Sequence, residues 1–221
     1  MAEVNLMDRY PRSKRPIAER GERLTDDHRA IASRFDKSYF DGERLTGYGG
    51  YNYHPRFWQE TVKRFRDHYK LAPDVRILDV GCAKGFMMRD FKELMPQADI
   101  RGIDISQYAI DNADPLAKPF MEKASADKLP FPDKSFDLVI AINVIHSLPH
   151  EACLQALREL ERVSRKNSFL SVDAWYNDEQ RQALMKWNLT GLTFFHVDRW
   201  KEIFREVGYT GDYHWFIAET E

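Results

Sequence analysis

The sequence predicts an α/β fold in which helices cover both faces of a mostly parallel, doubly wound sheet. From residue 77 onward, short apolar runs alternate with amphipathic helical stretches, the pattern of strand–helix–strand units. Residues 136–142 are almost continuously apolar, which is typical of a strand buried on both faces. The first apolar run ends at a glycine-containing turn, the place where open parallel sheets bind their ligands.

Local signals justify each element. Gly81 ends the first strand, and Pro96 stops the helix that follows it. Ser106 is the expected N-cap of a short helix, and Asp198 is the expected N-cap of the last helix, which Gly208 closes. The expected elements, in chain order, are a helix with Trp58, Val62, Phe65 and Tyr69 on one face, strand 77–80, helix 85–95, strand 100–105, a short helix after Ser106, strand 136–142, a helix from Pro149, strand 168–173, a helix from Asp198 and strand 213–218.

The first 55 residues differ in composition from the rest. Residues 8–24 mix six basic with three acidic side chains, and residues 47–53 form a glycine–tyrosine loop. One interpretation is a solvated tail with a surface loop. The other is a mobile lid, in which glycines permit motion and Tyr48, Tyr51 and Tyr53 supply apolar surface over a ligand. We therefore divide the chain into a lid or cap segment, 1–55, and a ligand-binding domain, 56–221.

Composition excludes several classes of protein. The 33 basic and 35 acidic residues give a net charge of −2, which disfavours nucleic acid or an anionic membrane as a partner. There is no 18-residue apolar run and no secretory signal, so we expect a cytoplasmic protein with a small-molecule ligand. Cys82 and Cys153 are too few for a disulfide scaffold or a zinc site, so no metal is expected. The sequence leaves the oligomeric state open.

The turn after the first strand predicts a nucleoside site. Gly81 and Gly85 let the backbone turn tightly and approach a ligand closely. Asp104 ends the second strand, where a carboxylate can accept hydrogen bonds from both ribose hydroxyls. The glycine patterns of dinucleotide and P-loop sites are absent. Asp79 beside the turn disfavours a phosphate and favours a ligand that carries a cation or an amino group.

Four motifs in order resemble class I S-adenosylmethionine (SAM)-dependent methyltransferases. Residues 77–85 are similar to the first motif of that family, Asp104 to its ribose-binding acid, residues 126–131 to its adenine-binding segment and residues 135–139 to the start of its fourth strand. The resemblance spans about residues 70–219 and implies a Rossmann-like methyltransferase fold with SAM as cofactor. There are two departures: Ala83 replaces a common glycine, and only one clear strand follows the last helix. The implied cofactor-binding residues are Asp79, Gly81, Cys82, Ala83, Gly85, Asp104, Ile105, Ala126, Asp127, Lys128, Leu129 and Asn143.

Two reactions remain open at the sequence level. The first is methyl transfer to a small acceptor, with His146 as a base or, equally, as a structural histidine. The second is sharper: the lid, Asn143 and the loop from Asp173 to Tyr176 resemble bacterial azetidine-2-carboxylate synthases. That resemblance implies that SAM cyclises to azetidine-2-carboxylate and expels 5′-methylthioadenosine, with Tyr176 facing the sulfonium. The sequence favours the cyclase and keeps the methyltransferase as its alternative; a regulator that only binds SAM is a third. The candidate catalytic residues are Tyr176, Asn143, His146 and Asp173.

Overall fold

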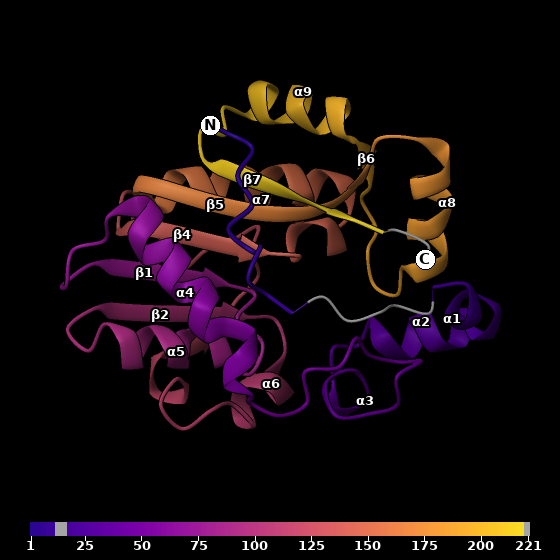
Figure 1. Ribbon diagram of the computed structural model, residues 1–221, viewed down its shortest axis with the longest axis horizontal. Coiled ribbons are helices and arrows are strands. Elements are labelled where there is room, and N and C mark those ends of the chain that lie inside the picture. Colours follow the sequence, from indigo (N-terminus) through magenta and orange to yellow (C-terminus); the bar gives the residue numbers. More distant parts are fainter. Residues whose placement is uncertain (12–16, 219–221) are drawn as a thin grey trace.

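The computed structural model describes residues 1–11 and 17–218 and contains one sheet with helices on both faces (Figure 1). The strands run in the order β3-β2-β1-β4-β5-β6, and β7 also pairs with β5. Every strand pairing in the sheet is parallel. The predicted α/β fold with a doubly wound sheet is therefore confirmed. The strands are β1 Arg76–Val80, β2 Asp99–Asp104, β3 Met121–Lys123, β4 Phe136–Ile142, β5 Ser164–Trp175, β6 Phe195–His196 and β7 Asp212–Ile217.

Alternate side chains of the central strands fill two separate cores. Ile77 packs in the core beneath α4 (Pro55–Tyr69) and α5 (Phe86–Leu94). Its neighbour Leu78 packs in the core beneath α7 (His150–Val163) and α9 (Val197–Val207). Because successive residues of a strand point to opposite faces, one apolar run supplies both cores.

The expected elements are present, but β5 extends beyond the expected residues 168–173, and neither β3 nor the helix α8 (Asp178–Trp187) was expected from the sequence. Ser106 does cap α6 (Gln107–Asp111), since its side chain accepts from the Ala109 N–H at 3.0 Å. Asp198 was wrongly expected to cap α9: the cap is His196, and Asp198 lies in the first turn, where its charge favours the helix dipole. The expected strand at residues 213–218 is β7, whereas β6 has only two residues and is too short to leave a pattern.

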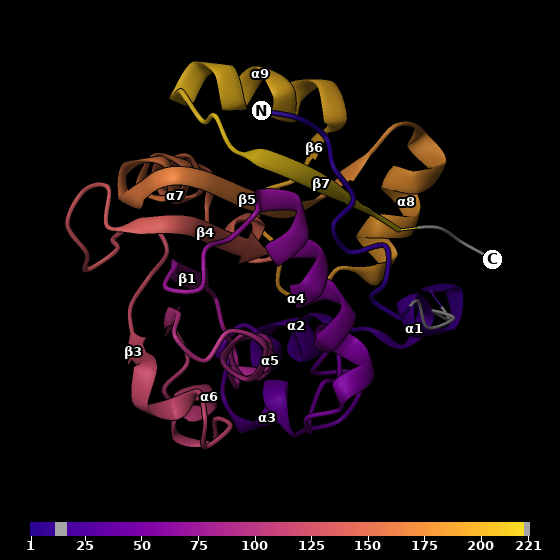
Figure 2. The same cartoon turned by 60° about the vertical axis from the view of Figure 1, so that its left-hand side comes forward.

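The N-terminal residues form two separate structures. Residues 2–4 lie along β7, with backbone hydrogen bonds from Val4 N to Tyr213 O and from Tyr213 N to Ala2 O. Residues 17–54, called the cap below, contain α1 (Ile17–Arg23), α2 (Asp26–Ala32) and α3 (Lys37–Phe40). Figures 1 and 2 both show α1 beside α8 (Asp178–Trp187), at the edge of the sheet where the strands end. In the part of the chain described here, no helix is long and apolar enough to span a membrane.

Candidate functional site

The turn between β1 and α5 is shaped by left-handed backbone at Gly81, Ala83 and Gly85, with φ of 76°, 50° and 75°. A Cβ on Gly81 would overlap Cγ2 of Val144, and one on Gly85 would overlap the side chain of Ala117. The N–H groups of Gly81 and Cys82 donate to the Ile103 carbonyl at 2.8 and 3.0 Å. These hydrogen bonds attach the turn to β2. The neighbouring side chains of Val144 and Ala117 leave no room for a side chain at either glycine.

Asp104 is fixed at the end of β2 by this turn. Its two carboxylate oxygens accept from the Ala83 N–H and the Ser106 N–H, each at 2.8 Å. Burial raises the pKa of Asp104, although these backbone bonds act in the other direction. A carboxylate has lone pairs for further donors, so two ribose hydroxyls can still bind. Ile105, half exposed beside it, offers an apolar surface to a flat base.

Asp79 is a second buried acid in the same place. It is 4% exposed, and burial together with the neighbouring charge of Asp104 raises its pKa to about 8. A cation bound nearby would favour its ionised form. The arrangement therefore suits a ligand with a positively charged group close to the turn. Cys82 is buried in the turn as a free thiol, and burial followed by the charges of Asp79 and Asp104 raises its pKa.

The expected adenine segment follows β3. Ala126 and Leu129 are buried in the same apolar cluster as Ile103 of β2, which places the segment beside the end of that strand. The Leu129 N–H donates to Oε2 of Glu159 at 2.8 Å. Asp127 is partly exposed and accepts from the Ser125 hydroxyl, and Lys128 is exposed.

The loop after β4 meets the end of β5. Asn143 has a left-handed backbone, with φ of 56°, and its side-chain oxygen accepts from the Ser171 hydroxyl at 3.0 Å. His146 and Asp173 are both buried and contact each other twice: the Asp173 N–H donates to Nδ1 at 3.3 Å, and Nε2 lies 3.4 Å from Oδ2. Because Asp173 engages both ring nitrogens, the histidine is held in one orientation.

Tyr176 is placed apart from this pair. Its hydroxyl donates to Oε1 of Glu3 at 3.1 Å, and Glu3 bridges to Tyr213 of β7. Its side chain is half exposed, and its backbone N–H donates to Gln180 at 2.8 Å. The structure thus brings Asn143, His146 and Asp173 to neighbouring strand ends and directs the Tyr176 hydroxyl toward the N-terminal residues on β7. The role of Tyr176 stays a prediction.

The cap is hydrogen-bonded to the turn after β1 and to the start of α6. Nζ of Lys84, in the turn, donates to Oδ1 of Asp41 at 2.5 Å and to the Tyr51 carbonyl at 2.9 Å. The Tyr108 hydroxyl donates to the other Asp41 oxygen at 2.7 Å. The Ser106 hydroxyl donates to the carbonyl of Phe35. Sequence reasoning missed Lys84 and Asp41 because they are 43 residues apart; the lysine inside the glycine turn was the available signal.

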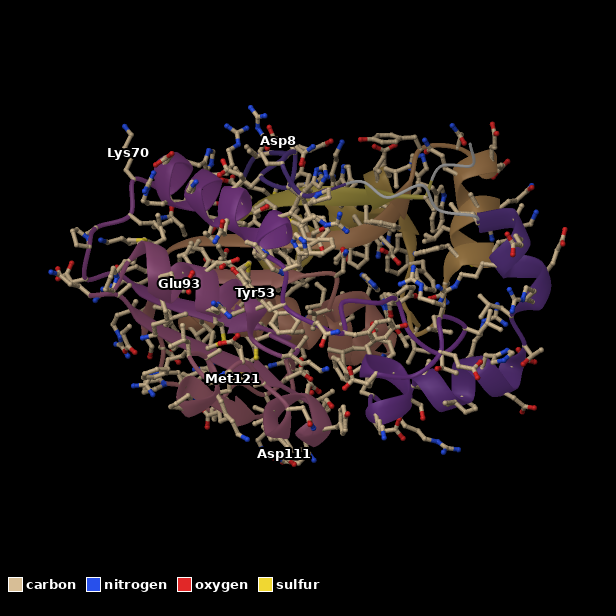
Figure 3. All side chains as sticks on the ribbon, turned by 60° about the horizontal axis from the view of Figure 1, so that its bottom comes forward. Asp8, Tyr53, Lys70, Glu93, Asp111 and Met121 are labelled. Carbon is tan, nitrogen blue, oxygen red and sulfur yellow. The ribbon has the colours of Figure 1, made fainter. Side chains whose placement is uncertain are left out.

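The three tyrosines expected in the lid have different surroundings. The Tyr48 hydroxyl accepts from the Leu189 N–H at 2.8 Å, and burial followed by the charge of Asp173 raises its pKa to about 12. The Tyr51 hydroxyl is buried without a partner among the described residues. Tyr53 instead contacts α5, since its hydroxyl donates to Asp90 at 2.6 Å. Figure 3 labels Tyr53 and Glu93, another residue of that helix.

Tyr39 is a site residue that the sequence did not reveal. Its ring lies 6.2 Å from that of Tyr48. Burial raises its pKa, and the charges of Tyr48, Asp104 and Asp173 add to the rise. Tyr39 stands outside the glycine–tyrosine loop, in α3, where no pattern distinguished it from a core aromatic.

Together these features make the ends of β1 and β2 a candidate nucleoside site: two glycines at left-handed turns, the buried carboxylate of Asp104 and the apolar side chain of Ile105. The residues fit SAM, because a positively charged group of the ligand near the turn would favour the ionised form of the buried acid Asp79. No cluster of three or more metal-ligating His, Cys, Asp or Glu side chains occurs in the described ranges.

Comparison with known proteins shows what the chain is similar to. Residues 78–172 match the family model described as a methyltransferase domain. The chain is similar to malonyl-[acyl-carrier protein] O-methyltransferase of Legionella pneumophila, with 31% identity over 62% of this chain and 48% of the relative. It is also similar to 27-O-demethylrifamycin SV methyltransferase of Amycolatopsis mediterranei, with 28% identity over 56% of this chain and 51% of the relative. It thus spans about half the length of these relatives.

A solved structure supports the fold. The YcgJ protein of Bacillus subtilis superimposes with a TM-score of 0.54 and 20% identity, covering 66% of each chain. At this identity the likeness concerns the fold alone.

Proposed function

We propose that the chain is a SAM-dependent methyltransferase that acts on a small-molecule acceptor. The observation that carries the proposal is the group formed by the left-handed turn at Gly81 and Gly85, the fixed carboxylate of Asp104 and the buried acid Asp79. The family match over residues 78–172 and the methyltransferase names of the relatives support it. These support methyl transfer better than cyclisation.

SAM supplies an electrophilic methyl carbon on a sulfonium. The chain's own residues then have three tasks: Asp104 holds the ribose, Ile105 and Leu129 contact the base, and Asp79 supplies negative charge beside the turn. Displacement at a methyl carbon depends mainly on position and on exclusion of water, and orientation alone is worth up to roughly 7–11 kcal/mol in favourable cases. The cap, bonded through Lys84 and Ser106, serves the exclusion of water.

His146 acts in this proposal as a positioning residue. Its contacts with Asp173 join the loop after β4 to the end of β5. The pair therefore fixes the relative position of the two segments that would line the acceptor site. A His146→Asn variant retains a hydrogen-bond acceptor near the Asp173 N–H. If His146 only holds these segments in place, the variant raises KM or lowers kcat and leaves the pH dependence of the rate unchanged. If one limb of the pH–rate profile disappears in the variant, His146 takes part in proton transfer.

A second candidate is the cyclisation of SAM without any acceptor. The observation that favours it is the cap, whose contacts at Lys84, Ser106 and Tyr48 enclose the site. None of the relatives described above is named as a cyclase, and Tyr176, the residue proposed to face the sulfonium, has its hydroxyl on Glu3. Methyl transfer therefore ranks first.

One experiment separates the candidates. The pure protein is incubated with SAM alone and with a panel of small hydroxyl, amine and carboxylate acceptors, and the products are identified by mass spectrometry. Methyl transfer predicts S-adenosylhomocysteine that increases with an acceptor; cyclisation predicts methylthioadenosine and azetidine-2-carboxylate without one. Asp104→Asn should weaken SAM binding about tenfold or more, whereas Asp198→Asn, at an exposed acid on α9, should not. A wild-type chain that does not bind SAM would overturn both candidates.

A further inference from the structure

A cavity lies in the cap, and none of its lining residues belongs to the proposed nucleoside site. It has a volume of about 170 Å³ and opens between α1, the segment before Tyr48 and the end of α8. Three arginines line it, Arg20, Arg23 and Arg44, together with Glu19, Glu43, Leu45 and Trp187. The proposed methyltransferase reaction gives none of these residues a task.

Arg20 is the unusual member of this group. It is 7% exposed, and its guanidinium lies beside two neighbouring rings, 5.3 Å from the centre of Tyr48 and 4.8 Å from the centre of Trp187. The side chain donates one hydrogen bond, from Nη2 to the Gly47 carbonyl at 3.3 Å, and its Nε is buried without a partner among the described residues. A buried guanidinium with an unused donor is costly unless something accepts from it.

The charges around Arg20 do not neutralise it. In residues 1–11 and 17–218, no carboxylate lies within ion-pair distance of Arg20 or of Arg44. Glu19 is paired with Arg23 at 3.6 Å instead. Arg44 donates to the Tyr48 carbonyl and brings a second positive charge close enough to lower the pKa of Arg20, after burial itself. The ring faces offset only part of this cost.

We infer that this cavity binds a small oxyanion, a carboxylate or a phosphate monoester, through Arg20 and Arg44. A guanidinium presents its N–H groups as a planar fork that matches such an anion. Leu45 and the Trp187 ring would contact an apolar or aromatic part of the same molecule. The anion supplies the negative charge that Arg20 and Arg44 lack within ion-pair distance among the described residues.

The position of this site connects it with the cap. Arg20 packs on Tyr48, whose hydroxyl accepts from Leu189, so an anion on Arg20 would hold the cap against α8 and the segment after it. Anything that binds only the folded state raises the melting temperature. Binding does not depend on methyl transfer, so the inference stands or falls separately from the proposed function.

The test uses calorimetric titration of the full chain with inorganic phosphate, phenyl phosphate, benzoate and, as a cationic control, benzamidine, at constant ionic strength. We expect saturable binding of at least one anion and none of benzamidine. Arg20→Gln and Arg44→Gln should each weaken it about tenfold or more, because each removes charged hydrogen bonds. Arg199→Gln, at an exposed arginine paired on α9, should leave it unchanged.

The outcomes separate the alternatives. Selective binding of the phosphates or of benzoate identifies the class of oxyanion. SAM affinity, measured in parallel, shows that each variant is folded, and the exposed Arg44 provides the test if Arg20→Gln does not fold. No saturable binding of any anion, or equal binding by wild type and both arginine variants, would overturn the inference. Anion binding in a chain that ignores SAM would instead overturn the proposed function alone.

Discussion

The turn after β1 and the cap border the same candidate site, but different kinds of interaction hold them in place. The turn depends on backbone: three left-handed residues, and N–H groups bonded to Ile103 and Asp104. The cap depends on side chains that cross from one region to the other, such as Lys84 to Asp41 and Ser106 to Phe35. The turn is therefore part of the sheet's own structure, whereas the cap is held against it by a few polar contacts. Damage to the turn should affect the whole domain, and damage to the cap contacts should affect the cap first.

The largest effect should follow Gly81→Ala. The new Cβ would overlap Val144 and force an alanine into left-handed backbone, so we expect a loss of about 2–4 kcal/mol in the free energy of unfolding and loss of SAM binding. Gly208→Ala is a matched control with a similar φ of 73° and no atom within 4 Å. It should cost about 1–2 kcal/mol from strain alone. Denaturant unfolding measures both; equal losses would show that contact with Val144 is unimportant.

Asp79 should give the turn a pH dependence of its own. Its folded pKa, about 8, lies above the unfolded value, so the folded state binds the proton more tightly. This contribution to stability is complete below the unfolded pKa and is lost as the pH rises through about 8. Without ligand, the melting temperature should therefore fall by several degrees more between pH 5 and pH 8 in wild type than in Asp79→Asn. Parallel melting curves for the two proteins would contradict this.

A smaller effect should come from the cap contact. Asp41→Asn removes the charge that faces buried Lys84 and should cost about 1–2 kcal/mol, since Asp41 is partly exposed. Burial alone would raise the pKa of Asp41, but hydrogen bonds from Lys84 and Tyr108 hold it below its ordinary value. The stabilisation is therefore present above the pKa of Asp41 in the unfolded chain. It is lost as the pH falls through the pKa of Asp41 in the folded protein. Hydrogen exchange should accelerate in residues 17–54 before the sheet. Glu60→Gln, which breaks the exposed pair with Lys63, is the control and should change little.

The smallest effect should come from Tyr176→Phe. The change removes one partly exposed hydrogen bond to Glu3 and should cost less than about 1 kcal/mol. If Tyr176 also contacts the sulfonium through its ring, turnover survives in Tyr176→Phe and falls in Tyr176→Ala. Steady-state kinetics of both variants measures this, and equal turnover in the two would remove Tyr176 from the reaction.

The contrast between turn and cap also explains what could be predicted from sequence. The turn, Asp104 and the strands are local features: glycines, a strand-end acid and apolar runs appear as patterns within about thirty residues. The contacts of Lys84 with Asp41, and of Tyr48 with Leu189, join residues 43 and 141 positions apart, and no local pattern specifies them. Arg20 appeared as one charge in a mixed run, yet the fold buries it against two rings. Charge alone did not reveal which arginine would turn inward.

The short pairing of residues 2–4 with β7 has a consequence for the behaviour of the protein in solution. One edge of β7 is occupied by β5, and these residues occupy backbone groups on the other. Unpaired strand edges are templates on which further chains add, so these residues shield part of the strand from intermolecular β-pairing. A bulky N-terminal fusion or the removal of the first five residues would uncover the edge of β7 at Tyr213, and the result would be measured as increased aggregation, even with the candidate nucleoside site intact.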